Sequence, residues 1–394
     1  MSFNSTPSSE RVHIGFFGLR NAGKSSVVNA VTAQELSLVS DVKGTTTDPV
    51  RKAMELLPIG PVVIIDTPGT DDEGALGEQR VRRAIKTLDE TDIAVLVIDA
   101  EKGETQADGE LKKLITERKI PLITVYNKTD LLTDVPSATE NEIYVSAASG
   151  KNIFELKEML GRIAADGKKE KRLIGDLLQK DDIVVLVTPI DESAPKGRMI
   201  LPQQQTIRDV LDSDAVCLVT KETQLETLLS SLPKKPRLVV TDSQAFGFVN
   251  KVVPKDIPLT SFSMLFARYK GDLFALADGA DTLDKLRDGD CVLISEGCTH
   301  HRQCNDIGTV KLPNWVKKYT GRNLVFDFTS GRDFPEDVSE YALVIHCGGC
   351  MLNDAEISSR ARRAKAQGVP MTNYGTAIAK MHGILDRAIK PLKP

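Results

Sequence analysis

The sequence predicts an α/β protein in which parallel strands alternate with helices. Short apolar runs such as VHIGFFG and PVVIIDTPG end in Gly, Asp or Asn, and each is followed by a stretch with helical periodicity. Continuous apolar runs of this kind are typical of strands that are buried on both faces of a doubly wound sheet. The chain has 394 residues, which is more than one ordinary hydrophobic core accommodates, so we expect several domains.

Two changes in composition predict the domain boundaries. The charged stretch GKKEKRLIGDLLQKDD ends the first αβ set, and a second set follows it with the runs IVVLVTPI, AVCLVT and PRLVVTDS. A weaker boundary falls near Pro258 to Ser261, ahead of the strand CVLISEG. The predicted domains are residues 1–167, 170–262 and 263–394.

Composition excludes several classes of partner. Lys and Arg number 51 against 55 acidic residues, a formal charge of −4, which gives no general attraction to nucleic acid or anionic lipid. The first residues are polar, and no apolar run approaches the roughly 18 residues that a membrane span needs. We therefore expect a cytoplasmic protein with neither nucleic acid nor a membrane as its partner.

The segment GLRNAGKS at 18–25 has the phosphate-loop pattern and stands between a predicted strand and a predicted helix. Gly18 and Gly23 allow the backbone to turn so that its N–H groups surround phosphates. Lys24 supplies a positive charge for the β- and γ-phosphate oxygens, and the Ser25 hydroxyl can coordinate Mg²⁺. The predicted phosphate-binding residues are Gly18, Asn21, Ala22, Gly23, Lys24, Ser25 and Ser26.

Three further motifs follow in the order expected for a guanine-nucleotide site. In DTPG, Asp66 can hold a water on Mg²⁺, and the N–H of Gly69 can sense the γ-phosphate. In NKTD, Asp130 can accept both N1–H and the 2-amino group of guanine, a pair of donors that adenine lacks. The predicted base-binding residues are Asn127, Lys128, Asp130, Ser146 and Ala147. Together the motifs predict binding and hydrolysis of GTP.

The run GTTTD at 44–48 is similar to the GTTRD loop of Era and TrmE-like GTPases. That resemblance implies that Thr46 is the second hydroxyl on Mg²⁺, with Thr45 and Thr47 as alternatives. It also implies a K⁺ ion at Asn21, which matches the potassium-binding asparagine of TrmE-like proteins. Thr70 stands where Ras-like proteins carry the glutamine that orients the attacking water. We therefore expect either slow hydrolysis or another means of promoting it. The catalytic candidates are Asn21, Lys24, Thr46 and Gly69.

Five of the six cysteines lie after residue 290, and two motifs there point to a metal centre: CTHH at 298–301 and HCGGC at 346–350. Each follows a predicted strand, and parallel strands end at one edge of a sheet, so three thiols could meet. In the HCGGC loop, which follows a predicted strand and precedes a predicted helix, we expect N–H donors and a helix dipole to favour the thiolate form of Cys347 and Cys350. The residues alone leave two centres open, a Cys₃His zinc site and a [4Fe–4S] cluster with one open iron.

The union of these motifs resembles the [FeFe]-hydrogenase maturation GTPase (HydF) family over essentially the whole chain. The resemblance implies a Ras-like P-loop GTPase domain followed by two smaller αβ domains, one for dimerisation and one for iron–sulfur cluster binding. It implies a [4Fe–4S] cluster on Cys298, Cys347 and Cys350. His300 and His346 would be labile ligands or would only shape the pocket.

The same resemblance implies a scaffold or carrier that forms a homodimer. Such a protein receives the diiron subcluster precursor from two radical-SAM maturases and delivers it to the [FeFe]-hydrogenase apoprotein. Two alternatives remain at this point. One is an RNA- or ribosome-associated GTPase of the Era/TrmE type with a structural zinc domain, and the other is a redox protein that uses the cluster for electron transfer.

Overall fold

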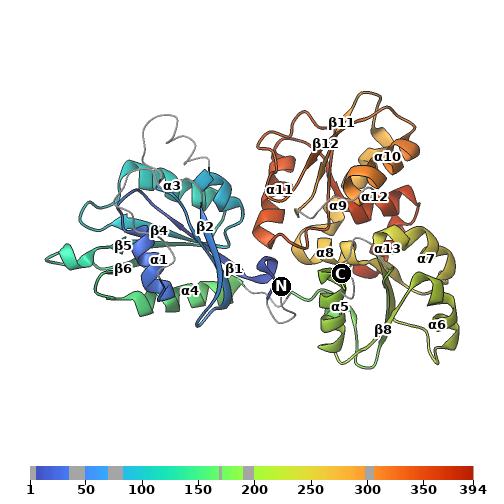
Figure 1. The fold of residues 1–394 in the computed structure, drawn as a ribbon, viewed down its shortest axis with the longest axis horizontal. Helices are drawn as coiled ribbons and strands as arrows, with labels where there is room; N and C mark the ends of the chain where they lie inside the picture. The colour runs from blue at the N-terminus through green and yellow to red at the C-terminus, as the bar shows by residue number, and fades with distance from the viewer. Residues whose placement is uncertain are drawn as a thin grey trace. The chain divides into compact units, whose positions relative to one another are not determined.

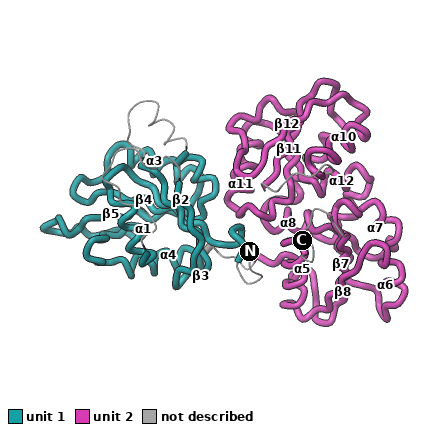
Figure 2. The backbone as a smooth tube through the Cα atoms, viewed as in Figure 1, with its two compact units in different colours: residues 1–169 teal, residues 170–394 magenta. Residues whose placement is uncertain are grey.

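The computed structural model describes residues 6–34, 49–69, 83–167, 171–189, 199–297 and 306–393. The chain divides into two compact units, residues 1–169 and residues 170–394, which Figure 2 shows in teal and magenta. Across the described ranges, none of the helices combines the length and the apolar character that crossing a membrane requires.

The first unit contains one sheet with the strand order β2-β3-β1-β4-β5-β6. All neighbours are parallel except β2, which pairs antiparallel with β3. The strands are β1 (Val12–Phe17), β2 (Val50–Leu56), β3 (Gly60–Asp66), β4 (Ile93–Asp99), β5 (Leu122–Asn127) and β6 (Glu142–Tyr144). The helices include α1 (Lys24–Thr32), α3 (Gln106–Glu117) and α4 (Ile153–Gly167).

This sheet is covered on both faces, as its continuous apolar strands predict. On one face, Val28 of α1 and Leu156 of α4 pack with Ile64 in one hydrophobic cluster. On the other face, Ile115 of α3 packs with Leu96 in a second cluster. Figure 1 shows these helices around the sheet, so the first unit has the predicted doubly wound architecture.

The second unit contains two parallel sheets, with the orders β10-β9-β7-β8 and β12-β11-β13-β14. The first consists of β7 (Ile183–Val187), β8 (Val216–Thr220), β9 (Leu238–Thr241) and β10 (Leu259–Ser261). The second consists of β11 (Cys291–Ser295), β12 (Val325–Thr329), β13 (Leu343–His346) and β14 (Met371–Asn373). Their helices are α5 (Leu201–Leu211), α6 (Leu225–Ser231), α7 (Phe246–Val252), α8 (Phe262–Lys270), α9 (Leu273–Ala280), α10 (Leu312–Thr320), α11 (Asp354–Ala366), α12 (Tyr374–Met381) and α13 (Leu385–Ile389).

Helices also cover both faces of the sheet formed by β11–β14. Val316 of α10 and Ile378 of α12 pack with Ile345 on one face, whereas Ala364 of α11 packs with Val344 on the other. In Figure 1, α11 accordingly lies on the opposite side of β11 and β12 from α10 and α12. The helix that follows the HCGGC motif, α11, is therefore anchored against the sheet that carries the motif.

The hydrophobic core around the sheet formed by β7–β10 includes residues from the C-terminal end of the chain. Ile389 of α13 belongs to the same hydrophobic cluster as Val239 of β9 and Phe262 of α8. A cluster that joins residues so distant in sequence ties the end of the chain to the segment around β7–β10. Residues 170–262 and 263–394 thus share apolar packing within one compact unit.

Candidate functional site

The backbone of the phosphate loop can be formed only with glycine at two positions. Gly18 has φ = 145° and Gly23 has φ = 82°, conformations that residues with a Cβ rarely adopt. A Cβ at Gly23 would lie 2.2 Å from Nδ2 of Asn127, and one at Gly18 would lie 2.3 Å from the carbonyl oxygen of Val97. The loop is therefore packed against Val97 of β4 and against Asn127, which ends β5 and begins the NKTD motif.

Two of the three predicted magnesium ligands, Ser25 and Asp66, meet at the start of α1. The Ser25 hydroxyl donates to Oδ2 of Asp66 at 2.8 Å, and Nζ of the buried Lys24 lies 3.8 Å from Oδ1 of the same carboxylate. Gly69 lies beside the phosphate loop, because a Cβ there would be 2.9 Å from the backbone nitrogen of Arg20. Hydroxyl, carboxylate and ammonium thus meet where the phosphates and Mg²⁺ of a bound nucleotide would lie.

The base-binding motifs are linked to the phosphate loop through Asn127. Its Nδ2 donates to the carbonyl of Ala22 at 3.2 Å, and its Oδ1 accepts from the backbone N–H of Ala147 at 3.0 Å. The Ser146 hydroxyl donates to Oδ1 of Asp130 at 2.5 Å. The structure therefore brings predicted residues from the carboxyl-end loops of β1, β5 and β6 into one site.

Sequence analysis did not single out Asp99, which also belongs to this site. Lys128 donates to Oδ2 of Asp99, the last residue of β4, at 2.5 Å. Burial raises the pKa of Asp99, but the hydrogen bond from Lys128 and neighbouring positive charges outweigh it and lower the pKa overall. The position of Asp99 at the end of an apolar strand could have indicated its place at this sheet edge. Thr46, the alternatives Thr45 and Thr47, and Thr70 lie outside the described residues.

The HCGGC motif begins at the end of β13, beside the end of β11. Residues Ser295 and His346 are paired in the parallel ladder, which confirms that both strands end at one edge of the sheet. The Cys347 thiol accepts hydrogen bonds from the backbone N–H of Gly297 at 3.0 Å and of Gly349 at 3.3 Å. The chain that leaves β11 therefore contacts the first sulfur of HCGGC.

Burial governs the protonation of the two thiols. It raises the pKa of Cys347 to about 11, with a further contribution from Cys350, although two N–H donors oppose the shift. Burial also raises the pKa of Cys350 against the opposing charge of Lys270. The N–H donors favour the thiolate of Cys347, as expected, but desolvation of the anion outweighs them, so the net shift of the pKa of the free thiol is upward.

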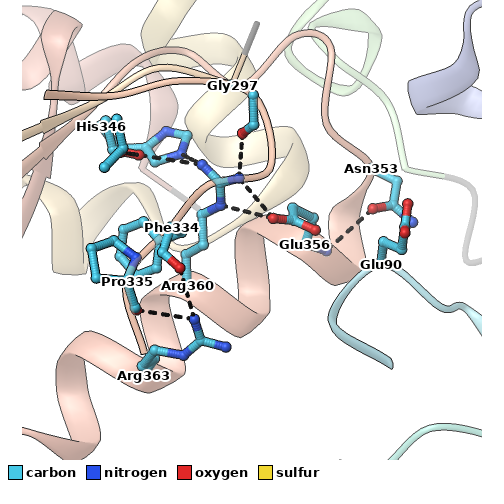
Figure 3. Close-up of polar contacts among 12 residues, drawn as sticks. Glu90, Gly297, Phe334, Pro335, His346, Asn353, Glu356, Arg360 and Arg363 are labelled. Carbon is cyan, nitrogen blue, oxygen red and sulfur yellow. Dashed lines mark hydrogen bonds and ion pairs between the residues drawn. The ribbon is translucent and has the colours of Figure 1, made fainter. Parts of the chain in front are cut away.

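Both ring nitrogens of His346 are engaged. Nδ1 donates to the carbonyl of Cys347 at 2.7 Å, and Nε2 accepts from Nη1 of Arg360 at 3.0 Å. Burial and the charge of Arg360 lower the pKa of His346 to about 3, so the ring is neutral near pH 7. Figure 3 shows the buried Arg360 reaching from α11 to both His346 and Glu356, whose Oε1 accepts from Nη2 at 2.7 Å. Sequence analysis missed Arg360; its spacing of four from Glu356 was the available signal.

A second buried cation holds the other half of the motif. Lys270, at the end of α8, donates from Nζ to the carbonyls of Leu352 at 2.6 Å, Gly349 at 3.2 Å and Cys350 at 3.4 Å. Three carbonyls aimed at one ammonium fix the path of the chain around Cys350. No sequence signal pointed to Lys270, because its role depends on how α8 packs against a loop that is distant in sequence.

The remaining predicted metal ligands cannot be placed. Cys298 and His300 lie outside the described residues, between Gly297 and Asp306. Among the residues that the structure does describe, no three His, Cys, Asp or Glu side chains are grouped to hold a metal ion. The described part of the site therefore consists of Cys347, Cys350 and the groups around them.

Three family models match the chain in succession. The model described as 50S ribosome-binding GTPase matches residues 13–128. The models described as Hydrogen maturase F dimerization domain and Hydrogen maturase F tetramerization domain match residues 173–271 and 273–391. The two hydrogen maturase models together cover nearly all of the second unit.

Individual relatives match the first unit. The tRNA modification GTPase MnmE of Nitrosomonas europaea is 34% identical over 160 residues, which is 39% of this chain and 35% of that protein. GTPase Der of Kosmotoga olearia is 33% identical over 174 residues, 39% of each chain. The chain thus spans less than two fifths of these proteins. Among solved structures, Aquifex aeolicus Era bound to GDP and AlF4⁻ is similar over 53% of this chain and 93% of its own, with 19% identity and a TM-score of 0.36.

Proposed function

Because the chain belongs to the hydrogenase maturation GTPases of the hydrogen maturase F (HydF) type, we propose that it is a carrier for the diiron subcluster of [FeFe]-hydrogenase. It hydrolyses GTP with its first unit. In this proposal its second unit holds a [4Fe–4S] cluster on Cys298, Cys347 and Cys350, receives the diiron precursor made by two radical-SAM maturases, and delivers it to the hydrogenase apoprotein.

One observation supports the proposal that these three cysteines share one cluster. The N–H of Gly297 lies 3.0 Å from the sulfur of Cys347, and Cys298 is the next residue. Consecutive Cα atoms are about 3.8 Å apart, so the covalent geometry of the chain would allow a thiol at position 298 to approach the first sulfur of HCGGC. Cys350 belongs to the same loop, which Lys270 and Gly349 hold in a tight turn.

The described groups suit a cluster. Backbone N–H groups that already point at a cysteine sulfur would serve a cluster thiolate equally well, since hydrogen bonds to the sulfurs stabilise such clusters. A [4Fe–4S] cluster on three thiolates supplies one iron with a replaceable ligand. The neighbouring side chains His346, Lys270 and Glu296 are buried, so the half-buried Cys347 and Cys350 lie against the protein interior.

For His346 we favour a role in shaping the pocket. Its two nitrogens are occupied by Cys347 and Arg360, so coordination would require the bond to a buried guanidinium to break. His300 remains the candidate for a labile ligand. Alanine substitution at each position separates the roles. The EPR signal of the reduced cluster should change for His300→Ala, and a comparable change for His346→Ala would contradict this division.

For GTP we propose a switch. The γ-phosphate and Mg²⁺ would draw the loop with Thr46 and the N–H of Gly69 toward Ser25 and Asp66, and the closed loops would alter contacts with partner proteins. A K⁺ ion at Asn21 would support hydrolysis. Turnover measured in K⁺ and in Na⁺ checks this last point, since equal rates would remove the ion from the proposal.

The decisive experiment is anaerobic reconstitution of the protein, followed by addition to a lysate that contains the two radical-SAM maturases and hydrogenase apoprotein. Hydrogen evolution that depends on the reconstituted protein is expected. The second candidate function, an RNA- or ribosome-associated GTPase with a structural zinc domain, is suggested by the match of the first unit to a ribosome-binding GTPase model. Metal analysis distinguishes the two candidates. A colourless, zinc-loaded protein that fails to activate the apoprotein would favour the RNA- or ribosome-associated GTPase.

A further inference from the structure

The residues that flank segment 298–305 on its two sides lie in close contact. Glu296 directly follows β11, stands two residues before Cys298, and is only 3% exposed. Gly308 lies on the other side of the segment, and a Cβ there would be 2.3 Å from Oε1 of Glu296. The carboxylate therefore occupies the space that a side chain at position 308 would need.

Tyr374, the first residue of α12, joins the two sides. Its hydroxyl donates to Oε1 of Glu296 at 3.2 Å, and a Cβ on Gly308 would be 2.4 Å from the same hydroxyl oxygen. Burial raises the pKa of Tyr374 well above its usual value, and the charges of Cys347 and Glu296 add to the shift. The phenol therefore keeps its proton and remains a donor near pH 7.

The position of Tyr374 is fixed by the sheet that carries the HCGGC motif. Asn373, the preceding residue, ends β14 and pairs with His346 of β13. The Asn373 side chain caps α12, because it accepts from the backbone N–H of Thr376 at 2.8 Å. Tyr374 also belongs to the hydrophobic cluster against which Cys347 packs. The phenol thus relates the chain around segment 298–305 to the strand that leads to Cys347.

The backbone on both sides of the segment is held as well. On one side, the N–H of Gly297 donates to the sulfur of Cys347 at 3.0 Å. On the other side, the buried Asp306 accepts from the N–H groups of Gly308 at 3.1 Å and Thr309 at 2.9 Å, at the start of the helical segment Ile307–Lys311. The contact of Glu296 with Tyr374 lies between these two anchored stretches.

We propose that Glu296 and Tyr374 are positioning residues that hold Cys298 close to Cys347. Anchoring both ends of a segment lowers the conformational entropy that remains to be lost when its thiol meets a partner. The proposal rests on the proposed cluster for the purpose of this arrangement. The proximity of the two thiols can nevertheless be measured without a cluster, so the two proposals can fail separately.

The test measures this proximity in the full-length, cluster-free protein with dibromobimane, a reagent that bridges two neighbouring thiols. A Cys304→Ser/Cys350→Ser background removes the cysteines nearest in sequence to the two that are probed. Mass spectrometry of the peptides should find a bridge between Cys298 and Cys347. Tyr374→Phe should lower its yield about fivefold, as expected for the loss of one buried hydrogen bond.

Tyr341→Phe is the matched control. Tyr341 is 8% exposed, against 7% for Tyr374, and its hydroxyl donates to Oδ2 of Asp327 on β12 at the same distance of 3.2 Å. This variant should form the bridge in the wild-type yield. Equal yields in the two tyrosine variants, or no bridge in the background protein, would overturn the proposal.

A double-mutant cycle shows whether the two residues act through one contact. Glu296→Ala/Tyr374→Phe should form as much bridge as Glu296→Ala alone, because the same hydrogen bond can be lost only once. Independent reductions that multiply in the double variant would contradict a shared contact.

Iron analysis after anaerobic reconstitution separates this inference from the carrier proposal. A bridge that depends on Tyr374 in a protein that binds no iron would refute the cluster and support the positioning role. A full complement of iron, with equal bridging in Tyr374→Phe and Tyr341→Phe, would support the cluster and refute the positioning role.

Discussion

At the scale of single residues, the two sites differ in how they are held. The nucleotide site depends on residues whose identity is fixed by backbone conformation, such as Gly23, and on short polar contacts such as Ser25 to Asp66. The cysteine site depends on two buried cations, Lys270 and Arg360, that bind the loop from different helices. A substitution in each site can therefore be paired with a control of the same chemistry.

Gly23→Ala should weaken nucleotide binding. The new Cβ would lie 2.2 Å from Nδ2 of Asn127 in a residue with φ = 82°, so the loop must move away from the phosphate position. Gly103→Ala is the matched control, because Gly103 has φ = 71° but nothing lies within 4 Å of its added Cβ. Affinity for a fluorescent GDP analogue should fall at least about tenfold only in the first variant. Equal affinities of the two variants for the GDP analogue would show that the loop relieves the clash without loss of nucleotide binding.

Lys270→Met should lower both the stability of the second unit and its iron content after reconstitution. The carbonyls of Leu352 and Cys350 would lose the Lys270 donor and that of Gly349 would keep only the N–H of Leu352, at a cost of about 1–3 kcal/mol. Lys285→Met, on an exposed lysine of the same unit, should change stability by no more than about 0.5 kcal/mol. Thermal unfolding and iron analysis of both variants check this, and full iron content in Lys270→Met would rule out a positioning role.

At the scale of strands and helices, the sequence patterns were informative wherever a motif follows a continuous apolar run. The strand, loop and helix around GLRNAGKS and the two strands before the cysteine motifs were predicted in this way. The antiparallel β2 was missed, since most of its residues are exposed and its pattern is not that of a buried strand. Lys270 was missed because its partners are set by tertiary packing, and the same holds for the contact of Arg360 with His346, although its spacing of four from Glu356 was readable in the sequence.

The edge strand β8 gives a prediction at this scale. Val216 and Val219 are each 45% exposed on the edge of a sheet that lies within the segment matched by the dimerization model. An exposed apolar edge strand is a ready surface for pairing with another chain. Val216→Lys/Val219→Lys should shift the protein toward monomers in light-scattering measurements. Val310→Lys, at another exposed valine, should not, and an unchanged mass for the β8 variant would exclude this edge as the interface.

At the scale of the whole molecule, the chemistry is divided between two compact units. The nucleotide motifs lie in residues 1–169 and the cysteine motifs in residues 170–394, and each unit has its own hydrophobic clusters. Such a division predicts that each site forms without the other. It also requires that any effect of GTP on the cluster be carried by a change of conformation or of partner.

Lys24→Ala tests this modularity. The substitution removes the ammonium that lies 3.8 Å from Asp66 and would neutralise the phosphates, so GTP hydrolysis should be lost. Iron content and the EPR signal of the reconstituted cluster should equal those of wild type. Loss of the cluster in this variant would show that the two units are not independent.

The central claim is that three thiols, at positions 298, 347 and 350, hold one cluster. Its most direct test is iron and sulfide analysis with EPR for five single Cys→Ser variants after identical anaerobic reconstitution. We expect about four irons per chain in the wild type, in Cys217→Ser and in Cys291→Ser. Cys298→Ser, Cys347→Ser and Cys350→Ser should each lose most of the iron and the signal. A full complement of iron with an unchanged signal in any of these last three would contradict the claim.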